Sequence, residues 1–430
     1  MLKAASAEQY TSVKKVLVTV CAASAAFLAY SSVYAFRKPF TVATFDGIKF
    51  WGITYQTLLI ISQVVGYTLS KFYGIKFIAE LNHLGRFRTA LTLVGTSWIC
   101  LLVFAIVPAP FGMLFLFING FMLGFLWGFI FSYVEGRRAT DFIGSVMAIS
   151  FIFAGGFTRS VAKWLLLKWE VTEYWMPFMT GLLFVVPLMF FLWVLESLPR
   201  PDEEDIKERN SREPMNKADR KHFLKTFGAG LIVITITYTL LTVMRDIRDN
   251  YMGNIWNELG FGSDYSIFAK TETNTSLIVL AIMGLLVVIR KNIKALLLVH
   301  IVIAFGLLLA GGSSFLFIHQ KISGQQWMQL VSMGLYLGYI PFNCIFFERL
   351  IASFRIKGNV GFLIYFADAF GYLGSVIVML GKEFFPLHLN WTQFYSNGVA
   401  AVSLLGIAAT CFSFFYFYKK YSWRKNQLSL

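Results

Sequence analysis

Long apolar runs constrain this 430-residue chain more than any other feature. A helix of about 17 to 25 apolar residues crosses the roughly 30 Å hydrocarbon layer of a bilayer. The chain is 57% hydrophobic and only 14% charged, as in proteins that cross a membrane many times. The sequence therefore predicts an all-α membrane protein with twelve transmembrane helices. The predicted spans are 14–36, 51–70, 88–107, 111–134, 142–166, 175–197, 224–248, 265–289, 295–317, 327–350, 359–380 and 395–418.

One long charged stretch interrupts this pattern. It reads LPRPDEEDIKERNSREPMNKADRKH and divides the predicted spans into six and six. Proteins built from two such halves commonly bind a substrate between them, near the middle of the bilayer. We expect an N-terminal six-helix bundle over 1–197, a cytoplasmic linker over 198–222 and a C-terminal six-helix bundle over 223–430.

The distribution of charge predicts the orientation in the membrane. The net charge is +15, but the basic residues gather in alternate connections instead of forming one patch, so we expect no nucleic-acid partner. The positive-inside rule then places both termini in the cytoplasm, and we expect a multi-pass protein of the plasma (inner) membrane. The basic segments are the N-terminus, 71–88, 137–138, 200–225, 290–294, 349–357 and the C-terminus.

The first predicted span ends in a polar stripe. Tyr30, Tyr34 and Arg37 are spaced i, i+4, i+7, which places them on one face if the run is helical, and Lys38 follows. An arginine at the centre of a bilayer costs roughly 2.5 to 3.5 kcal/mol on insertion scales. Arg37 is therefore expected either to line a cavity or to lie at a helix end beside the outer headgroups.

Two further spans carry comparable groups. Tyr67 and Lys71 share a face of the second span, although the lysine could equally reach the cytoplasmic surface. Arg245 and Arg248 close the seventh predicted span, at a depth similar to that of Arg37. Two guanidinium groups converging from opposite halves would suit a phosphate, because each binds two anionic oxygens at once. The alternative is that both arginines cap helix ends at the headgroups.

Several of these segments resemble one family. The stretch YSSVYAFRKPF at 30–40 resembles the first-helix signature of the organophosphate:phosphate antiporters, which are the glycerol-3-phosphate and hexose-phosphate transporters of the major facilitator superfamily. The segment 67–74 is similar to their second helix. Tyr339-Ile-Pro341 resembles the family's Y-x-P in the tenth helix, and FGYLG at 370–374 resembles its eleventh.

The resemblance implies the fold of that superfamily, with two six-helix bundles, and a phosphate site. Arg37 and Arg245 would be its anion-binding arginines. The residues implied to line the same cavity are Tyr30, Tyr34, Lys38, Tyr67, Lys71 and Tyr339.

The chain also departs from the family's pattern. Where the family has a histidine and an asparagine before the glycines of the fifth helix, this chain has Ser150 to Phe153 without a histidine, and Arg159 follows one turn after Gly156. Arg159 is expected to take over part of the histidine's role or to approach the outer headgroups. The spacing from arginine to aspartate in the seventh helix is shorter than the family's, so Arg248 rivals Arg245 as the second anion-binding arginine.

The predicted function is exchange of a phosphorylated metabolite for inorganic phosphate by alternating access. Two alternatives stay open, namely a proton-coupled carrier of another organic anion that uses Asp368, and a membrane sensor that binds a phosphorylated sugar without transporting it. Asp368 could equally form a structural ion pair. Salt bridges that gate the inner side are predicted for two groups: Glu135, Arg137 and Arg138, and Glu348, Arg349 and Arg355.

No sequence pattern points to catalysis. The chain has no G-x-x-x-x-G-K-[ST] loop and no metal-ligand cluster, and its four cysteines lie far apart within spans. His300 and His319, in or beside spans, have no evident partner. We therefore expect a monomeric protein that is not an enzyme, binds no cofactor, is surrounded by lipid, and has a small anion and inorganic phosphate as its ligands.

Overall fold

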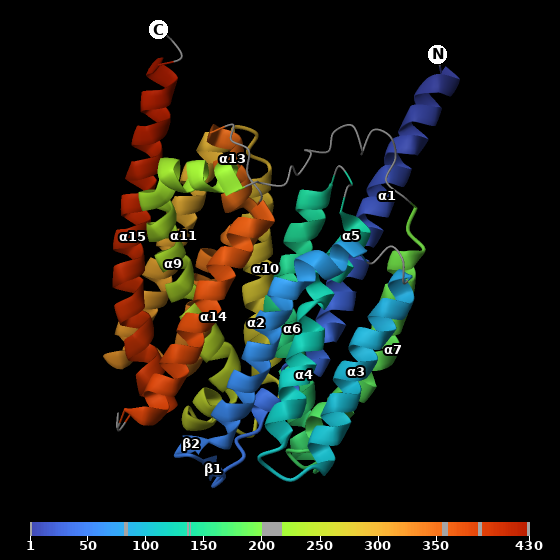
Figure 1. Ribbon diagram of the computed structural model, residues 1–430, viewed down its shortest axis with the longest axis vertical. Helices are drawn as coiled ribbons and strands as arrows, with labels where there is room; N and C mark the ends of the chain where they lie inside the picture. The colour runs from blue at the N-terminus through green and yellow to red at the C-terminus, as the bar shows by residue number, and fades with distance from the viewer. Residues whose placement is uncertain are drawn as a thin grey trace.

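The structure is a computed structural model that describes residues 2–80, 85–135, 137, 139–199, 217–354, 360–385 and 389–427. The predicted linker residues 200–216 and the predicted gating residues Arg138 and Arg355 lie outside the described residues. Helices account for nearly all of the described chain and form two bundles side by side (Figure 1).

The N-terminal bundle contains the first six crossings. The fourth crossing is two helices in sequence, and a two-stranded antiparallel hairpin precedes the second crossing. Its elements are α1 (Leu2–Val33), the 3₁₀ turns η1 (Tyr34–Phe36) and η2 (Pro39–Val42), β1 (Lys49–Phe50), β2 (Ile53–Thr54), α2 (Tyr55–Glu80), α3 (Arg86–Ile106), α4 (Gly112–Gly124), α5 (Leu126–Val134), α6 (Thr140–Lys168) and α7 (Met176–Glu196).

The C-terminal bundle contains the other six. Its fourth crossing is interrupted by one π-helical turn just after Pro341, which cannot donate a backbone hydrogen bond. Its elements are α9 (Lys217–Glu258), α10 (Ile267–Val287), α11 (Asn292–Ile318), α12 (Gly324–Pro341), the π-helix η4 (Phe342–Phe346), α13 (Phe347–Phe354), α14 (Val360–Phe384) and α15 (Trp391–Gln427).

The two bundles meet through two main helix pairs, α2 with α14 and α6 with α10. These are the second with the eleventh crossing and the fifth with the eighth. In each pair, the second crossing of one bundle meets the fifth crossing of the other, as a two-fold relation between the bundles requires. The two bundles approach closely at Gly156 in α6, where an added Cβ would lie 2.5 Å from both the Phe268 carbonyl oxygen and the Glu272 Cβ of α10. Only a glycine permits this contact.

The molecule has two distinct ends. Both chain termini lie at one end, and the β1–β2 hairpin lies at the other (Figure 1). We call these the terminal end and the hairpin end. Helices α1, α3, α6, α9, α11 and α14 begin at the terminal end, and the helices that follow them return to it.

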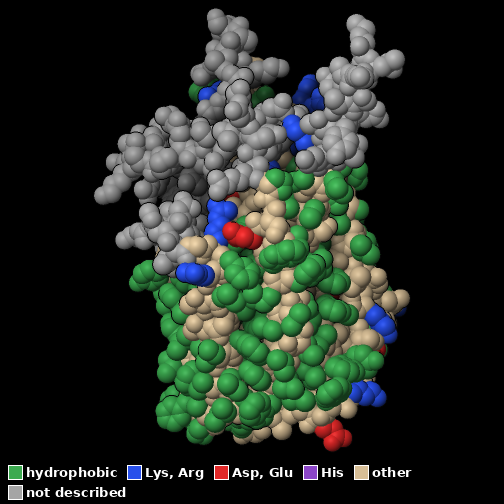
Figure 2. All heavy atoms as spheres, turned by 90° about the vertical axis from the view of Figure 1, so that its right-hand side faces the viewer, with side chains coloured by type: hydrophobic (Ala, Val, Ile, Leu, Met, Phe, Trp, Pro, Cys, Tyr) green, Lys and Arg blue, Asp and Glu red, His purple; other side chains and the backbone are tan. Residues whose placement is uncertain are grey.

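The outer surface is suited to lipid. Figure 2 shows one face on which apolar side chains form a broad band, with several Lys and Arg side chains near its edges. Large apolar side chains point outward from α7, among them Val186, Phe190 and Trp193. Ten helices among the described residues are long and apolar enough to cross a membrane. The protein is therefore an integral, multi-pass membrane protein, with α2 and α14 as the remaining crossings.

The seventh helix differs from the prediction. Its apolar run ends near Arg248, but α9 continues to Glu258 through Asp249, Asn250 and Asn254. Side chains of the other bundle meet the two asparagines, because Lys38 Nζ lies 2.9 Å from Asn250 Oδ1 and the Gln56 and Asn254 amides pair reciprocally. Hydropathy places the helix end too early here because the polar residues face protein, not water.

Candidate functional site

Arg37 does not lie on an α-helical face, contrary to the prediction. Helix α1 ends at Val33, and the chain continues as two 3₁₀ turns. Pro39 contributes to the change, because it lacks the N–H that would continue the helical hydrogen bonding. The break turns Arg37 into the protein, where it is 9% exposed. The alternative that Arg37 caps a helix end among the headgroups is therefore wrong.

The Arg37 guanidinium lies over an aromatic ring. Its Cζ is 3.8 Å from the centroid of Tyr67, which α2 contributes. Tyr34, Tyr372 and Tyr30 are its other main electrostatic neighbours. Within the described part of the chain, the Arg37 side chain has no ion pair and no hydrogen bond, and its buried Nε lacks a partner.

Arg245 repeats this arrangement in the C-terminal bundle. It is 8% exposed, and its Cζ lies 3.9 Å from the centroid of Tyr339 in α12. This burial also contradicts a headgroup position. Arg245 differs from Arg37 in having a carboxylate partner, because its Nη2 lies 2.6 Å from Asp246 Oδ1. The other oxygen of that carboxylate accepts a hydrogen bond of 2.9 Å from Ser375.

Two tyrosines link the two arginines. Tyr34 of the N-terminal bundle is an electrostatic neighbour of both Arg37 and Arg245. Tyr372 of α14 is also a neighbour of both, and its ring centroid lies 5.8 Å from that of Tyr67. The two guanidinium groups therefore approach one region between the bundles.

Arg248, the predicted rival, is occupied within its own bundle. It is 1% exposed, and its Nη2 lies 2.5 Å from Glu272 Oε1. The Ser332 hydroxyl donates to the same carboxylate at 3.1 Å. Arg248 is thus paired within its own bundle, whereas Arg245 shares the neighbours Tyr34 and Tyr372 with Arg37.

Lys38 and Arg159 connect the bundles. Besides its bond to Asn250, Lys38 is an electrostatic neighbour of Asp249. Arg159 is fully buried, which rules out the predicted approach to headgroups. It donates to Thr41 Oγ1 at 3.1 Å, to the Gly155 carbonyl at 2.8 Å and to the Asp249 carbonyl.

Lys71 and Asp368 lie on the facing helices α2 and α14. Lys71 Nζ is 4.7 Å from the Tyr67 ring centroid, so the predicted pairing on one helical face is present. Asp368 is buried and accepts a hydrogen bond from the Tyr238 hydroxyl, which also lies 3.2 Å from the Tyr339 hydroxyl. Lys71 and Arg245 are the basic neighbours of Asp368. A chain of polar groups therefore joins Asp368 to the ring beneath Arg245.

The predicted gating residues lie near the terminal end. Arg137 donates to the Pro199 carbonyl at 2.5 Å, and Arg349 donates to Asn292 Oδ1 at 2.6 Å. Glu135, Arg137 and Glu348 each have at least one further interaction. Their gating role stays a prediction.

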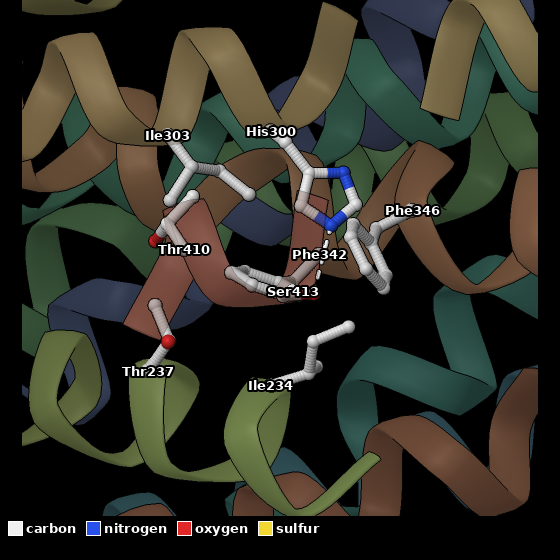
Figure 3. A pocket seen from close by; sticks show the side chains of 8 residues that line it. All are labelled: Ile234, Thr237, His300, Ile303, Phe342, Phe346, Thr410 and Ser413. Atoms are coloured by element: carbon white, nitrogen blue, oxygen red, sulfur yellow. Dashed lines mark hydrogen bonds between the residues drawn. The ribbon is translucent and has the colours of Figure 1, made fainter. Parts of the chain in front are cut away.

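His300 has partners that the sequence did not reveal. Its Nε2 lies 2.9 Å from Ser413 Oγ, and its Nδ1 lies 2.8 Å from the Leu296 carbonyl. Figure 3 shows it at the edge of a cavity of about 10 Å³, among mainly apolar side chains of α9, α11, η4 and α15. A space of that size holds at most one water molecule. His300 therefore packs α11 against α15 and is not part of the arginine site.

Sequence reasoning missed four members of the site, namely Tyr372, Tyr238, Asp246 and Ser375. Tyr372 lies inside the FGYLG segment, so a sequence signal was present. Tyr238 lies in an apolar run without a charged neighbour. Its contact with Asp368 joins residues 130 positions apart, and local spacing cannot show such a contact.

Known structures share this architecture. A nucleoside transporter, NupG, superposes with a TM-score of 0.59 at 15% identity, covering 94% of this chain and 99% of that one. A D-xylose-proton symporter superposes with a TM-score of 0.62 at 14% identity, covering 93% and 97%. Identities this low establish the fold alone. The fold is thus the twelve-helix, two-bundle fold of the major facilitator superfamily, as predicted.

Sequence comparison gives a family assignment. No curated protein sequence is significantly similar to this chain. The model of a family described as "Family of unknown function (DUF5690)" matches residues 39–420, which include Arg245 and most of both bundles. The chain therefore belongs to the DUF5690 family.

Proposed function

We propose that this protein carries a small organic anion across the membrane by alternating access, and that the anion is a phosphorylated metabolite exchanged for inorganic phosphate. One observation supports the proposal above all others. The buried Arg37 guanidinium lies on the Tyr67 ring and has no acidic partner among the described residues. A buried, unpaired cation is costly, so a site of this kind favours an anionic ligand.

The charge around the two arginines supports a doubly negative ligand. Charged side chains in this region form one connected set through their electrostatic contacts. Basic members exceed acidic members by two formal charges. The basic members are Arg37, Lys38, Lys71, Arg159, Arg245 and Arg248, and the acidic members are Asp246, Asp249, Glu272 and Asp368.

The chemistry of the groups fits a phosphate better than a carboxylate. Each guanidinium presents two parallel N–H donors, and two of them can bind a tetrahedral dianion from opposite sides. The hydroxyls of Tyr34 and Tyr372 would contact the remaining oxygens, because both tyrosines neighbour both arginines. The motif resemblance to organophosphate:phosphate antiporters points to the same ligand.

An anion of this charge would also act on the conformational cycle. With no ligand between them, Arg37 and Arg245 repel each other and oppose closure of the bundles around the site. A bound dianion removes that repulsion, so crossing with a ligand is easier than crossing empty. Exchange of one anion for another would therefore be faster than net flux.

Transport assays in liposomes test the proposal. We expect liposomes that contain the purified protein and internal phosphate to take up labelled phosphate rapidly. Arg37→Lys should reduce exchange at least about 100-fold, because an ammonium group cannot replace the two-donor fork. Arg88→Lys, at an exposed position of α3, is the matched control and should retain exchange. Normal exchange by Arg37→Lys would contradict the proposal.

A second function is favoured by the buried carboxylate of Asp368. Its contact with Tyr238, and through it with Tyr339, would connect protonation of Asp368 to the environment of Arg245. The protein would then couple uptake of an organic anion to protons. Uptake driven by an imposed pH gradient and lost in Asp368→Asn would support this function. Phosphate exchange that persists in Asp368→Asn without any pH gradient would support the first.

A further inference from the structure

The hydrogen bonds that join described residues of the two bundles lie in one part of the molecule. Every such bond among the described residues lies between the level of Arg159 and the hairpin end. The N-terminal bundle contributes Lys38, Thr54, Gln56, Thr57, Arg159 and Ser160, and the C-terminal bundle contributes Asp249, Asn250, Tyr251, Asn254, Ala269 and Glu383.

Glu383 has the most bonds across this interface. It lies at the end of α14, and its carboxylate accepts hydrogen bonds from the Thr54 hydroxyl at 2.6 Å and the Thr57 hydroxyl at 2.7 Å. The Thr54 backbone N–H lies 3.4 Å from its second oxygen. Thr54 directly precedes α2 and Thr57 lies in its first turn, where the helix dipole favours a negative charge.

The residues behind this contact are closely packed. Tyr251, at the kink in α9, shares a hydrogen bond of 2.6 Å with Thr57. The Tyr251 ring stacks on Trp391, with centroids 3.5 Å apart. Lys382 Nζ lies 4.2 Å from the Trp391 centroid. Glu383 thus lies beside the stacked rings of Tyr251 and Trp391 in the C-terminal bundle.

Two other carboxylates at the hairpin end make similar contacts, but each acts within one bundle. Glu173 accepts from the Thr44 and Phe45 backbone N–H groups, at 3.1 and 3.0 Å, all in the N-terminal bundle. Glu258 accepts from Trp391 and Thr392 at the start of α15, all in the C-terminal bundle. Among these three, only Glu383 loses its partners when the bundles separate.

We propose that Glu383 is the latch of a gate at the hairpin end. Its carboxylate holds the first turn of α2 against the C-terminal bundle, and the gate opens when that carboxylate exchanges Thr54 and Thr57 for water. This inference goes beyond the proposed function and does not depend on which ligand the arginines bind.

The surroundings of the latch suit a reversible contact. Glu383 and Thr54 are only half-buried, so water can reach the carboxylate, whereas the buried Thr57 would meet water only once the bundles separate. A hydrogen bond that can be replaced by one to water contributes little net free energy. Several such bonds together still favour the closed state of the gate. The amide pair of Gln56 and Asn254 lies beside the latch and breaks in the same movement.

Distances between spin labels test the latch. In a variant without the four native cysteines, one label pair at Lys49 and Gln393 reports on the hairpin end, and a second pair at Arg88 and Lys291 reports on the terminal end. All four positions are exposed, and each pair has one label on each bundle. Double electron–electron resonance gives the distance distribution of each pair in lipid nanodiscs.

We expect Glu383→Gln to raise the population with a long hairpin-end distance about tenfold, because an amide accepts hydrogen bonds more weakly than a carboxylate and has one acceptor oxygen instead of two. The terminal-end distance should shorten in the same fraction of molecules. Glu173→Gln, the matched control, should leave both distributions unchanged. Thr54→Val should have the same direction of effect as Glu383→Gln, and the double variant should add little to it.

Three outcomes would contradict the proposal that Glu383 is a latch. One is unchanged distances in both Glu383→Gln and Thr54→Val. Another is an equal effect of Glu173→Gln, which would indicate general loosening of the hairpin end. The third is a longer hairpin-end distance without a shorter terminal-end distance, which would indicate local fraying. None of these outcomes depends on phosphate exchange, so the latch and the proposed function fail separately.

Discussion

Arg37 and Arg245 occupy comparable positions in the two bundles, but their surroundings differ in one respect. Both guanidinium groups lie just under 4 Å above a tyrosine ring. Arg245 also has Asp246 beside it, whereas Arg37 has no carboxylate among the described residues. The structure thus completes one of the two cation sites by itself. Under the proposed function, the bound anion would complete the other.

The largest expected effect comes from removing each arginine in turn. Arg245→Ala leaves Asp246 buried with only Ser375 as its partner, which should lower the free energy of unfolding by about 3–5 kcal/mol. Arg37→Ala leaves no carboxylate unpaired and should cost no more than about 2 kcal/mol, the value of its cation–π contact. Unfolding by SDS in mixed micelles without phosphate measures both. Equal losses would mean that Arg37 has a partner equivalent to Asp246.

An intermediate effect is expected from the rings beneath the two cations. Tyr67→Leu removes the cation–π contact and should weaken phosphate binding by about 0.5–2 kcal/mol, while Tyr67→Phe keeps the ring and should change it less. Tyr339→Leu should weaken binding less than Tyr67→Leu, because Asp246 still holds Arg245 in place. Titration calorimetry on the purified variants gives the affinities, and the reverse order would contradict the comparison.

The smallest expected effect comes from Ser375. Ser375→Ala removes one hydrogen bond to Asp246 and should lower the free energy of unfolding by about 1 kcal/mol. Ser313→Ala, a buried serine that bonds only a backbone carbonyl in α11, is the matched control. If the Asp246 carboxylate tunes Arg245, only the Ser375 variant should also alter phosphate affinity.

The fold was largely predictable from the sequence. Each crossing needs enough apolar residues to span the bilayer, and this requirement is local, so the twelve runs identified the twelve crossings. The two errors have different causes. Helix α9 continues past Arg248 because Lys38 and Gln56 of the other bundle bond its asparagines, and no local rule anticipates partners roughly 200 residues away. The break at Arg37 did have a local signal, Pro39.

The site was predictable only in part. Spacing and resemblance identified Arg37, Tyr67, Lys71 and Arg245, and the structure brings the rings and cations among them into contact. Spacing cannot show how helices rotate relative to one another. For that reason the partner of Arg248, the Asp246–Ser375 bond and the position of Tyr372 between the arginines emerged only from the structure.

The glycine contact between α6 and α10 would determine how far each part of the molecule moves if the two bundles rock against each other. Under the proposed alternating access, the close contact at Gly156 would serve as the fulcrum of the two bundles. Arg159 lies three residues further along α6, about 4.5 Å by helical rise, and would barely be displaced. The tips of the helices lie several turns away and would sweep the widest arcs. A small tilt at the fulcrum would therefore produce a wide opening at either end of the molecule.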